Sequence, residues 1–339
     1  MSSPMLLGII IQTTILIILS IGFTFTYQIE KFPNFAHVSI STIGTIITYT
    51  ITQIWGQNPY LGWPVSALAC GFFGVIFYTL IIQPMKKKGC REISLAIVSL
   101  AVAIIIGAFI GIYSYWAVVI HRSPPVYFMI TAYDFSIFDL PGVAITAPIT
   151  CATLVIFLQL FLSKTRLGIA MRAVSENEQL SSILGVNTFK VHLVSWFIIG
   201  ALVGIGGAII PLWRSTNVGF SDEFLIAVMA ASLVGGIGRI YGAIIGGILV
   251  SLAMKGLTQV ISDYIQHAEP LLYEFSNAVR GFEQLIPIGM IFLVLMIEPE
   301  GITGFLDKPH SLTTKIRVFS RAISNQRIRR FPFITARIN

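Results

Sequence analysis

Long apolar stretches separated by short polar loops run through most of this 339-residue chain. A helix of about 20 apolar residues crosses a hydrocarbon core of about 30 Å, and most of the stretches approach that length. The pattern therefore predicts an all-α, polytopic transmembrane helix bundle of about eight to ten spans. The expected spans are residues 5–27, 38–55, 63–83, 93–119, 145–162, 191–212, 224–236, 241–262 and 285–297.

Two of these stretches are short, and the first one lies where a signal peptide would. Residues 224–236 and 285–297 are short for a full crossing, which leaves a tilted or re-entrant arrangement open for either. Residues 5–27 have no Lys or Arg before them and no small-residue cleavage site after them. These features favour a retained helix over a signal peptide.

Lys and Arg are unevenly distributed among the loops, and this distribution predicts the orientation. Loops 85–92 and 163–190 carry four each, and the segment after residue 301 carries eight. Loops 121–142, 211–223 and 263–284 carry one each. Because basic loops stay on the cytoplasmic side, we expect an outside N-terminus and a cytoplasmic C-terminus in the plasma membrane. Residues 1–304 would form the transmembrane domain and 305–339 a basic cytoplasmic tail.

Composition agrees with a membrane location. Hydrophobic residues make up 55% of the chain and charged residues 11%, with a mean hydropathy of +0.84. Soluble domains carry about 25% charged residues. The net charge of +7 lies beside apolar stretches without interleaved aromatics, which indicates lipid headgroups as partners and excludes nucleic acid. The spacing of Cys70, Cys90 and Cys151 suggests neither a metal site nor a disulfide.

Motifs for bond-making chemistry are missing from the sequence. It contains no G-x-x-x-x-G-K-[ST] loop for ATP hydrolysis, no H-E-x-x-H pair and no G-x-S-x-G elbow. The glycines between 235 and 242 follow an apolar helix and have the wrong spacing for a dinucleotide loop. We therefore expect a protein that is not an enzyme, with no catalytic residues, no cofactor and no metal.

Ionisable residues are almost missing from the predicted spans. Lys255 is the exception, near the outer end of its span, where its side chain either snorkels to water or contributes to a pathway. Carriers driven by ion gradients typically keep buried carboxylates or histidines. The scarcity favours a channel subunit or a transporter that a partner energises over the alternative of an ion-coupled secondary carrier.

The 163–190 loop contains a pattern typical of a short amphipathic helix. Ser175 followed by Glu178 matches a capping box that begins a helix, and Gly185 suits its left-handed end. Leu180, Ile183 and Leu184 fall on one face of that helix. Such a helix either lies on the membrane surface or docks into a groove of another protein.

Hydroxyl side chains line one face of the 38–55 span. Ser41, Thr45, Thr48 and Thr52 recur at helical spacing, so they stack on a single face. Because hydroxyls gain nothing from lipid, this hydroxyl stripe should face water in a translocation pathway or hydrogen-bond to other helices. Asn34 and His37, just before the stripe, would form a gate or cap the helix.

Glycines recur at spacings that allow close helix approach. Gly107/Gly111, Gly200/Gly204 and Gly242/Gly246 are G-x-x-x-G pairs, expected to pack inside the subunit. A second glycine-rich feature predicts a break between two helices, where backbone polar groups need a cavity or protein partners. Its members are Gly235, Gly236, Gly238, Gly242 and Gly246.

Four segments in register resemble the permeases of branched-chain amino acid ABC importers. They are the run Arg166-Leu-Gly-x-Ala-Met-Arg-Ala-Val with Glu176-Asn177 and Leu184-Gly185-Val-Asn187, the run Asn34-Phe-Ala-His37, the glycine-rich run from Val234 to Gly247, and Pro299-Glu-Gly-Ile-Thr-Gly304. The resemblance extends from about residue 8 to 304. Val38 stands where the family usually has Gly, and Glu298 where it usually has Arg.

The resemblance implies both partners and a mechanism. Two ABC ATPase subunits, a second homologous permease and an extracytoplasmic solute-binding protein would assemble with this chain, which would work by alternating access in the lipid bilayer. The resemblance also implies that the 163–190 loop couples the chain to an ATPase. The coupling residues would be Arg172, Ser175, Glu176, Asn177, Glu178, Leu180, Leu184 and Gly185.

Overall fold

The computed structural model describes residues 3–122, 128–137, 140–216, 221–268, 283–297 and 301–306. Within these ranges the regular secondary structure is helical apart from one short antiparallel pair, β1 (Ser136–Ile137) and β2 (Leu140–Pro141), and an isolated antiparallel bridge between Phe128 and Thr216. The predicted all-α fold is confirmed. The tail predicted for 305–339 lies almost wholly outside the described residues.

Short helical turns join and extend several of the helices. The π-helical segment Thr50–Ile54 continues α2, and a second one, Tyr78–Ile82, joins α3 to α4. Two 3₁₀ turns, Pro59–Leu61 and Thr131–Tyr133, lie in connections. The α-helices are α1 (Ser3–Glu30), α2 (His37–Tyr49), α3 (Gly62–Phe77), α4 (Gln83–Lys87), α5 (Glu92–His121), α6 (Gly142–Lys164), α7 (Arg166–Glu176), α8 (Glu178–Ile183), α9 (Thr188–Trp213), α10 (Ser221–Gly235), α11 (Ile240–Ala268), α13 (Leu285–Ile297) and α14 (Gly301–Leu306).

Seven helices of the described chain are long and apolar enough to cross a membrane. They are Leu6–Glu30, Pro59–Lys87, Glu92–His121, Val143–Lys164, Thr188–Trp213, Ile240–Thr258 and Leu285–Gly304. The other two predicted spans are also helical. One is the shorter apolar helix Phe224–Gly235. The other, α2 with its π-helical extension, falls outside the set of seven because hydroxyl and amide side chains reduce its hydropathy.

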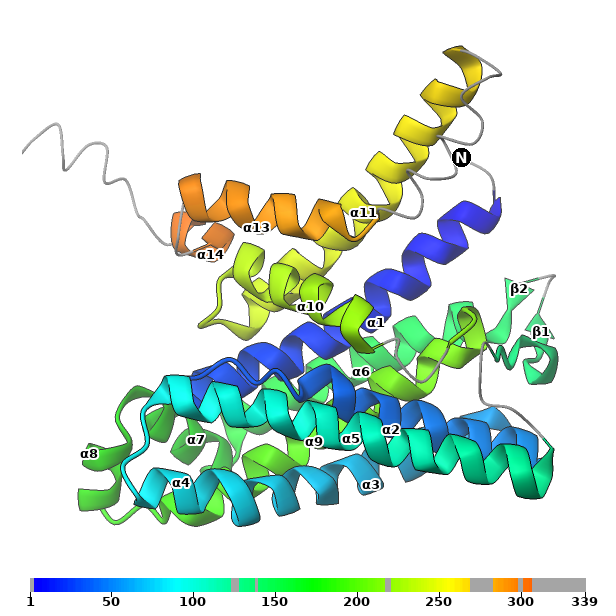
Figure 1. The fold of residues 1–339 in the computed structure, drawn as a ribbon. Helices are drawn as coiled ribbons and strands as arrows, with labels where there is room; N and C mark the ends of the chain where they lie inside the picture. Colours follow the sequence, from blue (N-terminus) through cyan, green and yellow to red (C-terminus); the bar gives the residue numbers. More distant parts are fainter. Residues whose placement is uncertain are drawn as a thin grey trace, which may run out of the picture.

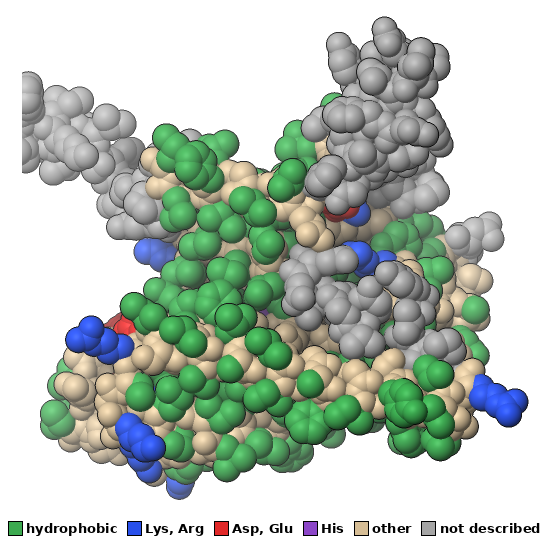
Figure 2. Space-filling model, in the orientation of Figure 1, with side chains coloured by type: hydrophobic (Ala, Val, Ile, Leu, Met, Phe, Trp, Pro, Cys, Tyr) green, Lys and Arg blue, Asp and Glu red, His purple; other side chains and the backbone are tan. Residues whose placement is uncertain are grey.

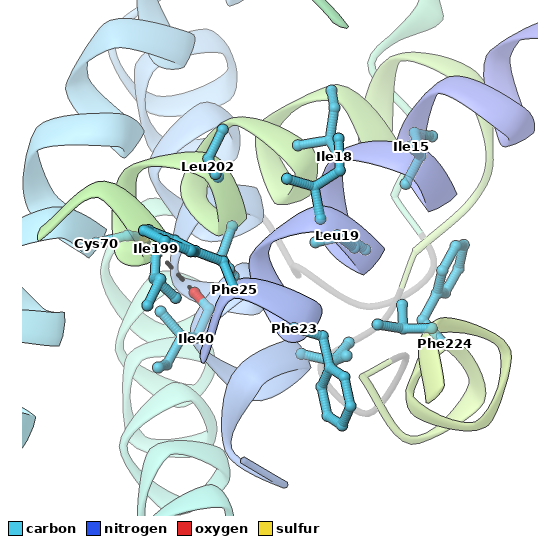
Figure 3. Close-up of a cluster of buried hydrophobic side chains, with 14 of the residues drawn as sticks. Ile15, Ile18, Leu19, Phe23, Phe25, Ile40, Cys70, Ile199, Leu202 and Phe224 are labelled. Carbon is cyan, nitrogen blue, oxygen red and sulfur yellow. Dashed lines mark hydrogen bonds between the residues drawn. The ribbon is translucent and has the colours of Figure 1, made fainter. Parts of the chain in front are cut away.

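Helix α1 lies at the centre of the bundle and contacts α6, α9, α10 and α11 (Figure 1). Its side chains meet those of neighbouring helices in a hydrophobic core. In Figure 3, Leu19 and Phe25 of α1 lie near Ile199 and Leu202 of α9, and Cys70 of α3 donates to the Ile40 carbonyl of α2. Burying α1 on several sides explains why its sequence is apolar all round rather than amphipathic.

Helix α9 packs against α2 and α3 through glycines. A Cβ atom on Gly200 would overlap the backbone carbonyl of Cys70 in α3, and one on Gly204 would overlap the carbonyl of Ser66. On the α2 side, Gly207 lies against the backbone of Ser41. The predicted internal packing of Gly200/Gly204 is confirmed. The absence of side chains here brings three helices to backbone contact.

The outer surface is strongly apolar along α5. Only 33% of the most hydrophobic 18-residue segment of α5 is buried. The side chains of Ile93, Ile104, Phe109 and Ile112 are all more than 65% exposed. Figure 2 shows hydrophobic side chains over the broad face of α3 and α5, with basic side chains at the helix ends. A surface of this kind suits hydrocarbon rather than water.

Gly107 and Gly111 lie on α5, where no other atom of the described residues lies within 4 Å of the positions of their missing Cβ atoms. The prediction that this pair packs inside the subunit is therefore wrong. The motif sets only the spacing of two small residues, and the neighbour that would use them must come from the fold.

Candidate functional site

The loop between α6 and α9 folds into two helices, α7 and α8. Asn177 separates them with an extended backbone (φ −153°, ψ 103°), and its side-chain oxygen accepts a hydrogen bond from the Leu180 N–H at 2.9 Å. The Ser175 hydroxyl instead donates to the Arg172 carbonyl inside α7. The predicted capping box at Ser175 is thus wrong, because α8 begins two residues later with Asn177 as its N-cap.

Helix α7 is anchored to the bundle. The Thr165 hydroxyl caps it by accepting from the Gly168 N–H at 2.9 Å, and Met171 and Val174 are buried. A Cβ atom on Gly168 would overlap the backbone of α6 at Phe161. The first part of the loop therefore holds a fixed position against α6. Arg172 and Glu176 lie on the exposed side of α7.

Helix α8 presents apolar side chains outward. Leu180, Ile183 and Leu184 are 53%, 82% and 75% exposed. Gly185 follows with φ +88°, which confirms the predicted left-handed end. We call Leu180, Ile183 and Leu184 the α8 apolar face. It lies at the end of the bundle that also carries α4 and α7 (Figure 1).

The hydroxyl stripe of α2 points into the protein. Ser41, Thr45, Thr48 and Thr52 are at most 1% exposed, and each donates to a backbone carbonyl one turn earlier in the helix. Thr45 also donates to the Gly207 carbonyl of α9 at 2.7 Å. These contacts satisfy the hydroxyls within the subunit and support the interhelical alternative over a water-lined path.

Asn34 and His37 precede and begin α2. The Asn34 side-chain oxygen accepts from the Ala36 N–H at 3.1 Å, whereas the N-cap position itself is Ala36. Nε2 of His37 donates to the Leu19 carbonyl of α1 at 2.8 Å. Nδ2 of Asn34 and Nδ1 of His37 are buried with no hydrogen-bond partner in the described chain. The Asn34 contact stabilises the turn before α2, and His37 ties that turn to α1.

The predicted glycine junction is a true helix break. Helix α10 ends at Gly235, Gly236 adopts φ +111°, and α11 begins at Ile240. The freed Gly235 carbonyl accepts from the Thr303 hydroxyl at 2.7 Å, so protein groups satisfy it. Gly242 and Gly246 then pack on the backbone of α10, at Gly235 and Ala231. Gly238 lies in the turn between the helices, with open space at its missing Cβ position.

Lys255 does not simply extend to water. Its ammonium group forms an ion pair of 2.9 Å with Glu283, which also accepts from the Gln12 side chain of α1 at 3.4 Å. These residues border a cavity of about 130 Å³ together with Trp213 and Phe224. The partly exposed ammonium group of Lys255 thus has a carboxylate partner in the loop that follows its span.

Sequence reasoning missed a cluster of ionisable side chains beside α8. Glu30 ends α1, Lys86 lies in α4 and His192 in the first turns of α9, and Glu178 of α8 joins them. The hydrogen bond from His192 lowers the pKa of the Glu178 carboxyl from its usual value, and the charge of Lys86 adds to this effect. No local motif marks these residues, because they come from four separate segments of the chain.

The fold and the site define a multi-pass membrane protein whose conspicuous exposed feature is a short helix carried by an end loop. Residues 5–295 match the family described as "Branched-chain amino acid transport system / permease component". The chain therefore belongs to this family and is the permease component of a branched-chain amino acid ABC transport system. Permease subunits of this family lack an ATPase domain.

Several relatives are similar over most of their length. The probable branched-chain amino acid transport permease protein LivH of Methanocaldococcus jannaschii is 33% identical, with 88% of this chain and 91% of the relative covered. LivH of Escherichia coli K12, a high-affinity branched-chain amino acid transport system permease protein, is 25% identical, with 85% of this chain and 90% of the relative covered. BraD of Pseudomonas aeruginosa, with the same description, is 24% identical, with 85% of this chain and 91% of the relative covered.

One solved structure is also similar in chain path. PsaBC from Streptococcus pneumoniae, in complex with Fab, covers 88% of this chain and 93% of its own, with a TM-score of 0.48 and 14% identity. Membership of an ABC transport system implies partners that hydrolyse ATP and bind solute.

Proposed function

We propose that this permease passes a branched-chain amino acid across the plasma membrane by alternating access, and that α8 couples it to a partner ATPase subunit. The observation that carries the proposal is the α8 apolar face, whose three side chains are each more than half exposed. Such a face requires a hydrophobic partner. An amphipathic helix commonly finds one in a groove of another protein.

Helix α8 is suited to a protein groove rather than to a lipid surface. It spans only Glu178–Ile183, and its neighbours Arg172, Glu176 and Gln179 are exposed polar residues. The α8 apolar face thus covers little more than one turn, and helices that lie in the interface are usually much longer. A groove of matching shape would enclose this small face and exclude water from it.

The complete transporter would contain two ATPase subunits, a second homologous permease and an extracytoplasmic solute-binding protein. The relatives support this composition by their descriptions as permease proteins of transport systems. We further propose that the end of the bundle with α4, α7 and α8 faces the cytoplasm. The basic loops 85–92 and 163–190 meet at that end, where Lys86 contacts Glu178.

A cysteine at Ile183 tests the docking of α8. This side chain is 82% exposed and forms the outermost part of the α8 apolar face. In the assembled transporter, Ile183→Cys should form a cross-link to the ATPase subunit with a short bifunctional thiol reagent. The unaltered chain is the matched control, since its cysteines include the partly buried Cys90 at the same end. A cross-link that forms only with lipid probes would refute the docking proposal.

A further inference from the structure

Four ionisable side chains from four helices meet where α8 joins the bundle. Nδ1 of His192 lies 2.7 Å from Oε1 of Glu30, and Nε2 lies 3.0 Å from Oε1 of Glu178. Nζ of Lys86 lies 2.5 Å from Oε2 of Glu30 and 3.8 Å from Oε2 of Glu178. The four residues form a closed ring of contacts, which we call the ionic ring. It connects α1, α4, α8 and α9.

The geometry of His192 fixes its charge. A carboxylate oxygen only accepts hydrogen bonds, and a neutral imidazole donates from one nitrogen alone. Because both ring nitrogens of His192 face ionised carboxylates at hydrogen-bonding distance, both must donate, and the ring is an imidazolium. Two positive groups then balance two negative groups. The ionic ring is neutral as a whole, which lowers the cost of burying its members.

The inner half of the ionic ring is rigid. The side chain of Glu30 is fully buried, and that of His192 is 1% exposed. Nε1 of Trp196 also donates to Glu30 at 2.8 Å, and the Tyr78 ring stacks on His192 with centroids 5.3 Å apart. A buried carboxylate with this many partners has no low-energy alternative position. Glu30 and His192 therefore move together, and they belong to α1 and α9.

The outer half of the ionic ring is the link to α8. Among the described residues of α8, Glu178 forms every ion pair, and its side chain is 46% exposed. A cavity of about 1630 Å³ separates part of α8 from α4 and from the start of α5. Side chains on both sides line this cavity, among them Lys87, Glu92, Gln179 and Ile183. Packing on that side does not hold α8 in place. Helix α8 contacts α7 and α9 on its other side, where Ser181 is buried, and Glu178 adds the ion pairs that link it to His192 and Lys86.

We propose that Glu178 and His192 are positioning residues for energy coupling: the ionic ring transmits displacement of α8 to α1 and α9. This inference rests on the proposed docking of α8 to an ATPase subunit. A movement of α8 pulls on the His192 imidazolium through Glu178. Because His192 is held between the two carboxylates, the same movement reaches Glu30 at the end of α1. Helix α1 lies at the bundle centre, so its displacement affects α6, α9, α10 and α11 together.

The test removes the link to α8 and keeps the contacts of Glu30. Glu178→Ala leaves the contacts of Glu30 with His192, Lys86 and Trp196 in place, so the subunit should fold. Glu178→Gln keeps an acceptor for His192 but loses the charge. Glu92→Ala is the matched control, because Glu92 is an exposed carboxylate on the same cavity that forms no ion pair within the described chain. Each variant also carries Ile183→Cys to report docking.

The measurement uses the complete transporter in proteoliposomes, with its ATPases, second permease and binding protein. Uptake of radiolabelled leucine, isoleucine or valine and hydrolysis of ATP are followed in the same preparation. We expect Glu178→Ala to lower the amount of solute moved per ATP at least about tenfold, Glu178→Gln to lower it less, and Glu92→Ala to match the unaltered transporter. The Ile183→Cys cross-link should form equally in all of them.

The outcomes separate the inference from the proposed function. No cross-link in the parent carrying Ile183→Cys alone would mean that α8 does not dock, and both ideas fail. A normal cross-link with unchanged solute per ATP in Glu178→Ala would overturn the ionic-ring inference and leave docking intact. Loss of the cross-link in Glu178→Ala alone would assign Glu178 to docking itself, which also overturns the inference. Uncoupled hydrolysis with a normal cross-link supports it.

Discussion

The Thr45 hydroxyl donates a hydrogen bond of 2.7 Å to the Gly207 carbonyl, although the two residues are 162 positions apart. The bond crosses from α2 to α9 where Gly207 has no side chain and the backbones touch. It assigns at least one member of the hydroxyl stripe to helix packing. The same contact offers a direct way to separate packing from a pathway role.

Thr45→Val should weaken the subunit without blocking transport directly. Valine keeps the shape of threonine but cannot donate, and interhelical hydrogen bonds in membranes contribute about 0.6 kcal/mol on average and about 1.7 kcal/mol at most. We expect a loss of stability within that range, measured by denaturant unfolding of the purified subunit. Thr45→Ser, which retains the donor, is the control. Unchanged stability with reduced uptake would restore the pathway interpretation.

The sequence was sufficient to locate the helices because apolar length is a property of each segment alone. The break at Gly236 and the left-handed end at Gly185 were predictable for the same local reason, since few residues other than glycine adopt positive φ. The start of α8 was not predictable in this way. Ser175 and Asn177 are both good N-cap residues, and only the extended backbone at Asn177 decides between them.

The candidate site was predictable only in part. The α8 apolar face follows from helical periodicity, whereas the ionic ring does not. Glu30 and His192 are 162 residues apart, and neither stands in a motif with Lys86 or Glu178. G-x-x-x-G pairs show the same limit. The spacing at Gly200/Gly204 and at Gly107/Gly111 is identical, but within the part of the chain that the structure describes only the first pair packs against a neighbouring helix. Contacts between distant segments depend on the fold.

Alanine at two glycines should therefore have opposite effects. Gly200→Ala places a methyl group on the Cys70 backbone and must move α9 away from α3, so we expect a loss of about 1–3 kcal/mol. Gly107→Ala meets open space on α5 and should leave the stability unchanged or raise it by up to about 1 kcal/mol through helix propensity. Thermal unfolding in detergent measures both. Equal destabilisation by the two substitutions would contradict the described packing.

The Lys255–Glu283 pair makes a third prediction. Both side chains are partly exposed, at 36% and 21%, so solvent screens the pair and Glu283→Gln should cost less than about 1 kcal/mol. Glu283→Lys should cost more, because it places a like charge beside Lys255. Exchanging the two residues, with Lys255→Glu and Glu283→Lys together, should restore most of the stability. Thermal unfolding at low and high salt measures these differences. A snorkelling Lys255 would make Glu283→Lys harmless.

Acid should reveal the contribution of Glu178 to the fold. The hydrogen bond from His192 lowers the pKa of Glu178 below its usual value of 4.5, so the folded state favours the ionised carboxylate. A group with a lowered pKa stabilises the folded protein fully above the unfolded pKa, and this stabilisation is lost as the pH falls through the folded pKa. We expect the unaltered subunit to unfold at a higher temperature than Glu178→Gln near neutral pH. The difference should shrink below about pH 4.5 and vanish once Glu178 is protonated in the fold.

Glu92→Gln, which alters an exposed carboxylate outside the ionic ring, should follow the unaltered subunit throughout. A difference between Glu178→Gln and the unaltered subunit that persisted unchanged through this acid range would show that the charge of Glu178 does not stabilise the junction of α8 with α9.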